Sequence, residues 1–209
     1  HNVDLTPSLK SWMPRNRSLQ VLDICGTLSH LITCLQYSSV LCLTFVVTNY
    51  NNNNNNSDCK QKLITAVQHN KTLHHLIVRG KYYDWACDLV EAVVRNNTLT
   101  ELDIDSPRVI ETKWLHEILN HNKSLQILRL TFEQIFHIHR FERRVLMEAI
   151  TQHPTLHVFE FGTNQYPELE QCARKKRLEH AGFADKHRCP CTVCDRSYLK
   201  TIEAMMPFH

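Results

Sequence analysis

A tight cysteine cluster near the C-terminus is the first group whose residue types and spacing suggest chemistry. Cys189, Cys191 and Cys194 stand in the sequence Cys-Pro-Cys-x-x-Cys, and His187 or His180 is near enough to be a fourth ligand. The Cys-x-x-Cys half has the spacing of a structural zinc site. The Cys-x-Cys half is not typical of such a site, and no second Cys-x-x-Cys pair occurs. The favoured interpretation is free or redox-active thiols, with structural zinc as the alternative.

Histidines are numerous, but they form no recognisable catalytic or metal-binding motif. The closest sets are His74-His75, His137-x-His139, and His116 with His121. None has a His-Glu-x-x-His arrangement or a third ligand, and most are expected to be exposed. The sequence also lacks Gly-x-Gly-x-x-Gly and Walker motifs. We therefore predict a protein that is not an enzyme and uses no cofactor.

Composition and charge narrow the class of protein further. The 209 residues carry a formal net charge of +3. Apart from the run Arg174 to Arg177, Lys and Arg are spread along the chain. This spread favours neither nucleic acid nor membrane as a partner. The most apolar run, Val40 to Val47, is too short to cross a bilayer. Nine cysteines without a disulfide framework indicate a cytoplasmic protein, and the basic run leaves a nuclear location open.

Internal repeats are the most informative feature of the sequence. Each unit has apolar residues at i, i+3 and i+4, then Asn-x-Ser/Thr-Leu-x-x-Leu-x-Leu or a close variant. Leu73, Leu99 and Leu125 occupy the same place in three consecutive units, 26 residues apart. Further copies contain Leu19 and Leu156, and a degenerate copy lies between the first and third units. Such self-similarity predicts six stacked units.

The pattern of one unit predicts a helix, a turn and a strand. Leu115, Ile118 and Leu119 share one face of a helix, whereas the second half alternates with the period of a strand. The Asn between them is expected to end the helix in a left-handed conformation. The Ser or Thr that follows is expected to bond a backbone group. This turn explains the Asn-x-Ser/Thr sequences without glycosylation.

These repeats resemble the leucine-rich-repeat family, in the ribonuclease-inhibitor-like subclass that includes the sensor region of NOD-like receptors. The resemblance covers roughly residues 5–165. It implies an α/β solenoid with parallel strands on a concave face, helices outside, and a role in protein recognition. The family's usual Asn, eight residues after the first strand leucine, is kept only at Asn164, so the usual buried Asn ladder is expected to be mostly absent.

The chain divides into a solenoid and a C-terminal appendage. The solenoid spans 5–165 and is interrupted by an Asn-rich loop at 49–57, which is expected to be disordered because six asparagines cannot form a core. Residues 166–209 are expected to form a helical cap that carries the cysteine cluster. Its helices are predicted from about Pro167 to His180 and from about Asp195 onward.

Strand positions between the buried leucines are expected to face the concave groove. Three acidic residues stand in the middle strand, with an arginine on each adjacent strand. This mixed strip is our candidate partner-binding site: His75, Arg79, Glu101, Asp103, Asp105, Ile127, Arg129 and Glu160. The alternative is that these charges only solvate the sheet and pair across strands.

The sequence therefore favours a protein-binding scaffold or sensor module, either a monomer or part of a larger assembly. The alternative is an adaptor or regulator of an enzyme, such as a ubiquitin-ligase adaptor, in which the cysteine-containing tail, with or without bound zinc, engages a second component. A regulator of a GTPase or nuclease is a third hypothesis, because some proteins of this repeat class act so. Fold resemblance alone is a weak guide among them.

Native mass spectrometry of the reduced protein tests the cysteine cluster. We expect the bare mass of the chain, because the Cys-Pro-Cys spacing does not suit a tetrahedral zinc site. The contrary result is a single zinc adduct that disappears when Cys191 and Cys194 are both replaced by Ser. That outcome would make the tail a metal module and favour the adaptor hypothesis.

Overall fold

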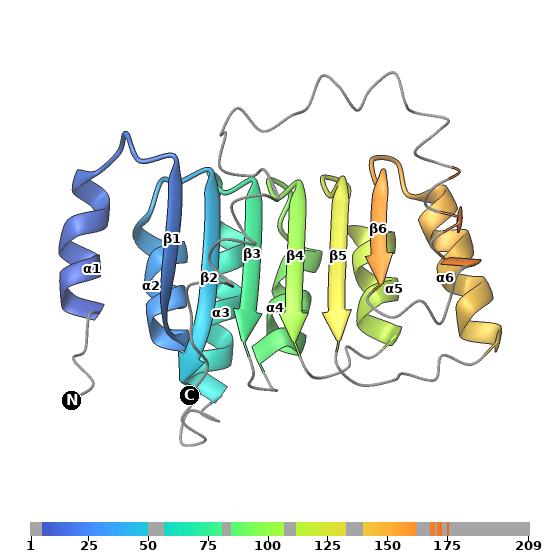
Figure 1. Ribbon diagram of the computed structural model, residues 1–209, viewed down its shortest axis with the longest axis horizontal. Coiled ribbons are helices and arrows are strands. Elements are labelled where there is room, and N and C mark those ends of the chain that lie inside the picture. The colour runs from blue at the N-terminus through green and yellow to red at the C-terminus, as the bar shows by residue number, and fades with distance from the viewer. Residues whose placement is uncertain are drawn as a thin grey trace, which may run out of the picture.

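A computed structural model shows one parallel sheet covered on one side by helices. It describes residues 6–49, 57–80, 85–106, 112–132, 140–161, 168, 169, 171, 172 and 175. The strands lie side by side in chain order (Figure 1). They are β1 (Val21–Thr27), β2 (Cys42–Asn49), β3 (His75–Gly80), β4 (Glu101–Ser106), β5 (Ile127–Phe132) and β6 (Val158–Phe161).

The helices alternate with the strands and lie behind the sheet (Figure 1). They are α1 (Thr6–Trp12), the short 3-10 helix η1 (Met13–Arg15), α2 (Leu28–Tyr37), α3 (Ser57–His69), α4 (Trp85–Val94), α5 (Thr112–His121) and α6 (Arg140–Gln152). Six helix–strand units in a parallel sheet confirm the predicted α/β repeat solenoid.

The repeated leucines form a continuous core between the two layers. Leu76, Leu102 and Leu128 point from consecutive strands toward the helices, and Leu89 and Leu115 point back from consecutive helices; all five are fully buried. Each helix packs against the next helix, and buried side chains of the helices and strands belong to one cluster. A single unit therefore buries its apolar face only because its neighbours cover it, as in other stacked repeats.

A ladder of buried asparagines joins the turns between helix and strand. Asn70, Asn96 and Asn122 are 7%, 3% and 1% exposed. The side-chain amide of Asn96 donates to the backbone oxygens of Val67 at 2.6 Å and Asn70 at 3.1 Å, both in the preceding unit. Asn122 repeats this pattern one unit later. Each amide thus ties its own turn to the previous one.

The other end of the same amide closes the turn. The Asn96 Oδ1 accepts hydrogen bonds from the backbone N–H of Thr98 at 2.9 Å and of Leu99 at 2.8 Å. The predicted left-handed conformation is wrong, because no non-glycine residue in the described part of the chain has a positive φ. The asparagine is used for its side-chain donor and acceptor, which satisfy backbone groups that the helix end leaves unpaired.

The sixth unit keeps the ladder with a histidine. His153 is 2% exposed, and its Nε2 lies 2.7 Å from the backbone oxygen of Asn122. Its Nδ1 accepts from the backbone N–H of Leu156 at 3.0 Å. An Asn ladder is therefore present, but it stands at the helix-end turn and not at the family's usual position after the strand. His153 and His30 are also exceptions to the expected exposure of histidines.

The hydroxyl residues of the repeat bond the backbone, as expected, but across units. The hydroxyl of Thr98 donates to Asn70 O at 3.1 Å, and that of Ser124 donates to Leu99 O at 2.8 Å. The buried amides of Asn96 and Asn122 are engaged by protein groups. This agrees with the prediction that the turn, and not a glycan, explains the Asn-x-Ser/Thr sequences.

Both boundaries of the Asn-rich loop differ from the sequence prediction. Asn49 belongs to β2 and Ser57 begins α3, so only 50–56 of the predicted Asn-rich loop lies outside both elements and outside the described residues. Trp12 occupies the i+3 position of the first unit but is 45% exposed, because in the described part of the chain α1 has a neighbouring helix, α2, on one side. Among the described residues, no helix is long and apolar enough to cross a bilayer.

The C-terminal segment is described only at its beginning. Glu168, Leu169, Gln171, Cys172 and Lys175 are helical, which agrees with a helix that starts near Pro167. Leu169 is fully buried and extends the core, and Glu168 forms an ion pair with Arg143 of α6 at 2.7 Å. The predicted second helix and the cysteine cluster lie outside the described residues.

Replacing Asn96 by Ala tests the ladder. We expect the free energy of unfolding to fall by about 2–4 kcal/mol, because buried backbone groups of two units lose their partners. Asn97→Ala removes the same side chain from the adjacent, exposed position and should change it by less than about 0.5 kcal/mol. Equal effects of the two substitutions in denaturant titrations would contradict a structural role for the ladder.

Candidate functional site

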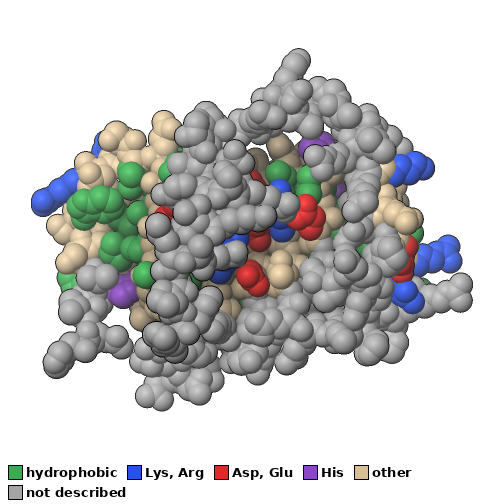
Figure 2. Space-filling model, in the orientation of Figure 1, with side chains coloured by type: hydrophobic (Ala, Val, Ile, Leu, Met, Phe, Trp, Pro, Cys, Tyr) green, Lys and Arg blue, Asp and Glu red, His purple; other side chains and the backbone are tan. Residues whose placement is uncertain are grey.

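The strand register places every predicted site residue on one surface. Side chains that point away from the helices form three rows across the sheet, and we call this surface the strand face. The rows are Val21, Cys42, His75, Glu101, Ile127 and Val158; Asp23, Thr44, Ile77, Asp103, Arg129 and Glu160; and Cys25, Val46, Arg79, Asp105 and Thr131. Acidic and basic side chains gather at its centre, over β3 to β5 (Figure 2).

A chain of charged contacts crosses four strands of this face. The Nδ1 of His75 lies 2.7 Å from one carboxylate oxygen of Glu101, and the guanidinium of Arg129 donates to the other. The Nε of Arg129 lies 3.2 Å from a carboxylate oxygen of Glu160. The side chains of His75 and Glu101 are each only 14% exposed. The cross-strand pairing weighed in the sequence analysis therefore exists.

Glu101 is an ionised hydrogen-bond acceptor at the centre of this chain of contacts. Burial raises the pKa of its carboxyl, but the hydrogen bond from His75 and the positive charge of Arg129 outweigh burial, so that the pKa lies below its usual value. Both of its oxygens are engaged, which makes Glu101 a poor proton acceptor. Its arrangement suits a fixed structural charge, not a general base.

Asp103 stands two residues further along β4 in a different environment. Burial is the largest influence and raises the pKa of its carboxyl, while the charges of Arg129 and Arg79 only partly offset it. None of the described residues donates a hydrogen bond to it. In the register it lies between Ile77, which is 7% exposed, and Arg129, whose guanidinium binds Glu101 and Glu160.

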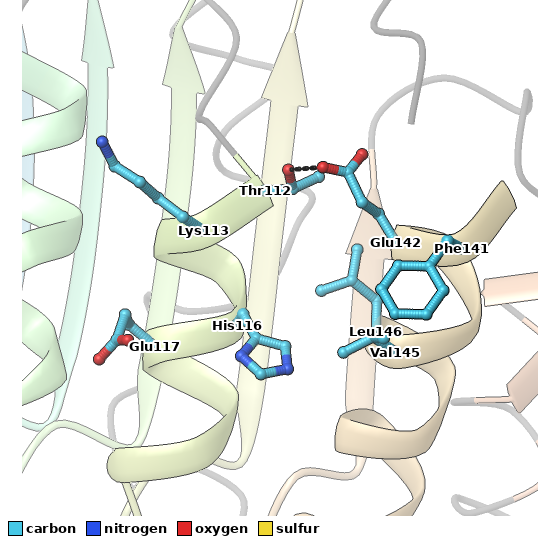
Figure 3. A pocket seen from close by; sticks show the side chains of 8 residues that line it. All are labelled: Thr112, Lys113, His116, Glu117, Phe141, Glu142, Val145 and Leu146. Carbon is cyan, nitrogen blue, oxygen red and sulfur yellow. Dashed lines mark hydrogen bonds between the residues drawn. The ribbon is translucent and has the colours of Figure 1, made fainter. Parts of the chain in front are cut away.

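A second surface feature lies on the helix side, between α5 and α6. It is a shallow groove of about 290 Å³, lined by Thr112, Lys113, His116, Glu117, Phe141, Glu142, Val145 and Leu146 (Figure 3). Thr112 donates a hydrogen bond to Glu142 at 3.2 Å across it. The Phe141 side chain is 77% exposed.

The sequence analysis missed this groove, although a signal was present. Phe141 and Val145 are one helical turn apart and lie off the buried stripe of Leu146, Ala149 and Ile150. An apolar pair on the polar side of an amphipathic helix is a mark of an exposed contact surface.

Metal-binding groups are not assembled in the described part of the chain. No cluster of three or more His, Cys, Asp or Glu side chains suits a metal ion among those residues. His74 and His121 are exposed and His116 is half-buried, and each bonds to a nearby group of its own unit. The possible zinc ligands His187, Cys189, Cys191 and Cys194, like His137 and His139, lie outside the described residues.

Comparison with known proteins identifies the fold but not a family. No family model and no curated protein matches the sequence. The structure is similar to the C-terminal domain of a Caenorhabditis elegans tropomodulin, with a TM-score of 0.52 and 13% identity over 89% of this chain and 100% of that one. Actin-binding site 2 of leiomodin-1 gives a TM-score of 0.47 at 13% identity, over 77% and 86% of the two chains. The likeness to the tropomodulin domain supports a leucine-rich-repeat-like fold.

Two substitutions on β4 test whether the charge of Glu101 stabilises the fold and the charge of Asp103 does not. Glu101→Gln should lower the free energy of unfolding at pH 7 by about 1–3 kcal/mol, because a charged acceptor of two donors is lost. Asp103→Asn, the same chemical change, should not lower it, because burial of that charge opposes folding.

The pH dependence of unfolding distinguishes the two carboxylates. The pKa of Glu101 is lowered on folding, so its contribution is present above the unfolded-state value near 4.5 and is lost as pH falls through the folded value. The pKa of Asp103 is raised on folding, so its charge costs stability above the folded value. A pH titration in which Glu101→Gln retains the full wild-type loss of stability below pH 4.5 would contradict these assignments.

Proposed function

We propose that this chain is a non-enzymatic protein-binding scaffold or sensor module that recognises a partner through the strand face. The observation that carries this proposal is the chain of contacts from His75 through Glu101 and Arg129 to Glu160. Side chains already held in place lose little conformational entropy when a partner binds. Ile127 lies in the register between Glu101 and Val158 and adds apolar contact area beside the charges.

Binding suits this surface better than catalysis. The pKa of Glu101 is lowered by its two donors, so it holds its charge and does not exchange protons near neutral pH. Arg129 is occupied by two carboxylates. We therefore propose that the module works without a cofactor, and that a protein, not a nucleic acid or a membrane, is its partner.

The finer classification and the location are also proposals. A helix in every unit supports the ribonuclease-inhibitor-like subclass suggested by the sequence. A reducing compartment such as the cytoplasm is supported by the six described cysteines, which are all free thiols. Burial raises the pKa of the Cys34 thiol to about 12, which keeps it unreactive in the core.

An adaptor that contacts two proteins is the second candidate. The groove between α5 and α6 favours it, because exposed Phe141 lies on the helix side of the molecule, behind the sheet. An adaptor needs two separate surfaces, and the strand face and this groove provide them. In that case the strand face recruits one protein and the groove, or the tail beyond it, engages another.

A matched pair of arginine substitutions tests recognition through the strand face. The intact chain is immobilised, and proteins retained from a lysate of its source are quantified by mass spectrometry. Ile127→Arg places a bulky charge on the strand face, whereas Thr65→Arg places it on the exposed side of α3. We expect a specific set of proteins to be retained by wild type and Thr65→Arg and depleted about tenfold or more by Ile127→Arg.

Thermal unfolding of both variants controls for loss of fold. A retained set that is unaffected by Ile127→Arg, or equally affected by Thr65→Arg, would rule out the strand face as the recognition surface. Depletion by substitutions at Phe141, with no effect of Ile127→Arg, would transfer the function to the groove.

A further inference from the structure

The strand face carries more acidic than basic side chains. Its three rows contain five carboxylates, at Asp23, Glu101, Asp103, Asp105 and Glu160, and two guanidiniums, at Arg79 and Arg129. With His75 counted as neutral, the two positive and five negative charges of these described rows sum to −3. The chain as a whole has a net charge of +3. The negative charge is therefore a local property of the strand face.

The two arginines of these rows do not donate a hydrogen bond to every carboxylate. Arg129 is shared between Glu101 and Glu160. Arg79 lies beside Asp105 in the register. Asp103 receives only the longer-range influence of these guanidiniums and accepts no hydrogen bond from a described residue. A half-buried carboxylate that accepts no hydrogen bond from these residues has acceptor capacity left for a donor from outside the fold.

The surroundings of Asp103 increase the strength of any ion pair made there. The register partner of Asp103 on β3 is Ile77, which is 7% exposed. Along β4, Asp103 is flanked by Glu101 and Asp105. An apolar neighbour lowers the local dielectric constant, and the flanking carboxylates add to the negative potential. A cation at this position also reverses the cost that burial imposes on the Asp103 charge.

We propose that the partner of the strand face is a basic protein segment that places an arginine or lysine side chain against Asp103. The inference rests on the proposed protein-binding function and names the chemistry of its partner. The excess of carboxylates attracts such a segment and repels an acidic one. Ile127, which is half-buried on the adjacent strand, provides apolar contact area beside the ion pair.

The experiment uses a phage-displayed library of random dodecapeptides selected against the intact chain. Clones whose binding is abolished by Ile127→Arg are kept, and their synthetic peptides are measured by fluorescence polarisation. We expect these peptides to be enriched in Arg and Lys over the unselected library, and to bind more weakly as salt is raised.

Charge-removing variants then test the assigned residue. Asp103→Asn should weaken binding by roughly 30-fold or more, because one partner of an ion pair shielded from water is lost. Asp103→Glu keeps the charge and should retain more affinity than Asp103→Asn. Asp58→Asn removes the same charge from the exposed surface of α3 and should change the affinity by less than about twofold.

The outcomes separate this inference from the proposed function. Peptides that need Ile127 but are neutral or acidic, or that bind Asp103→Asn as well as wild type, would overturn the basic-partner inference and leave the binding function standing. Equal losses with Asp103→Asn and Asp58→Asn would also overturn it, because the effect would be one of overall charge. Failure to recover any clone that depends on Ile127 would count against the strand face as a binding site.

Discussion

The buried amides of Asn70, Asn96 and Asn122 are the constraint on which the rest of the structure depends. Each amide donates to the backbone of the preceding unit and accepts from the turn that leads into its own strand. Consecutive strands therefore begin at the same level, and the parallel register follows. Because the register decides which side chains are neighbours across the sheet, the arrangement of the strand face is a consequence of hydrogen bonds made at its edge.

The two central carboxylates of β4 have different surroundings: one stabilises the sheet, and the other is the residue that we propose contacts a partner. Glu101 has donors on both adjacent strands, so its charge stabilises the sheet. Asp103, on the same side of the same strand, lacks a donor among the described residues, and burial raises the pKa of its carboxyl. The hydrogen bonds of Glu101 fix the geometry of the sheet around Asp103. We propose that the Asp103 carboxylate, held in place in this way, accepts an ion pair from a partner.

The likeness to a tropomodulin domain at only 13% identity can be understood from the two sides of each strand, one facing the core and one facing outward. Side chains that point inward, such as Leu76, Leu102 and Leu128, are fully buried, and such positions determine the fold. Side chains that point outward are free to differ without affecting the core. A fold can thus be shared while the binding surface is not, and the function of this chain must be argued from its own strand face.

The sequence by itself determined the six units, the parallel α/β solenoid and the side of each strand that faces outward, because periodic burial of leucines leaves little choice of fold. It also named the eight residues of the candidate site, since strand alternation puts them on one face. It did not reveal the Asn ladder, because the residue type suggested a backbone conformation and only packing shows that the amide bridges two units. Tertiary structure alone decided that Arg129 pairs with Glu101 and Glu160 and that none of the described residues donates a hydrogen bond to Asp103. Periodicity specifies which way a side chain points, whereas its partners depend on side chains from neighbouring strands competing for the same few donors.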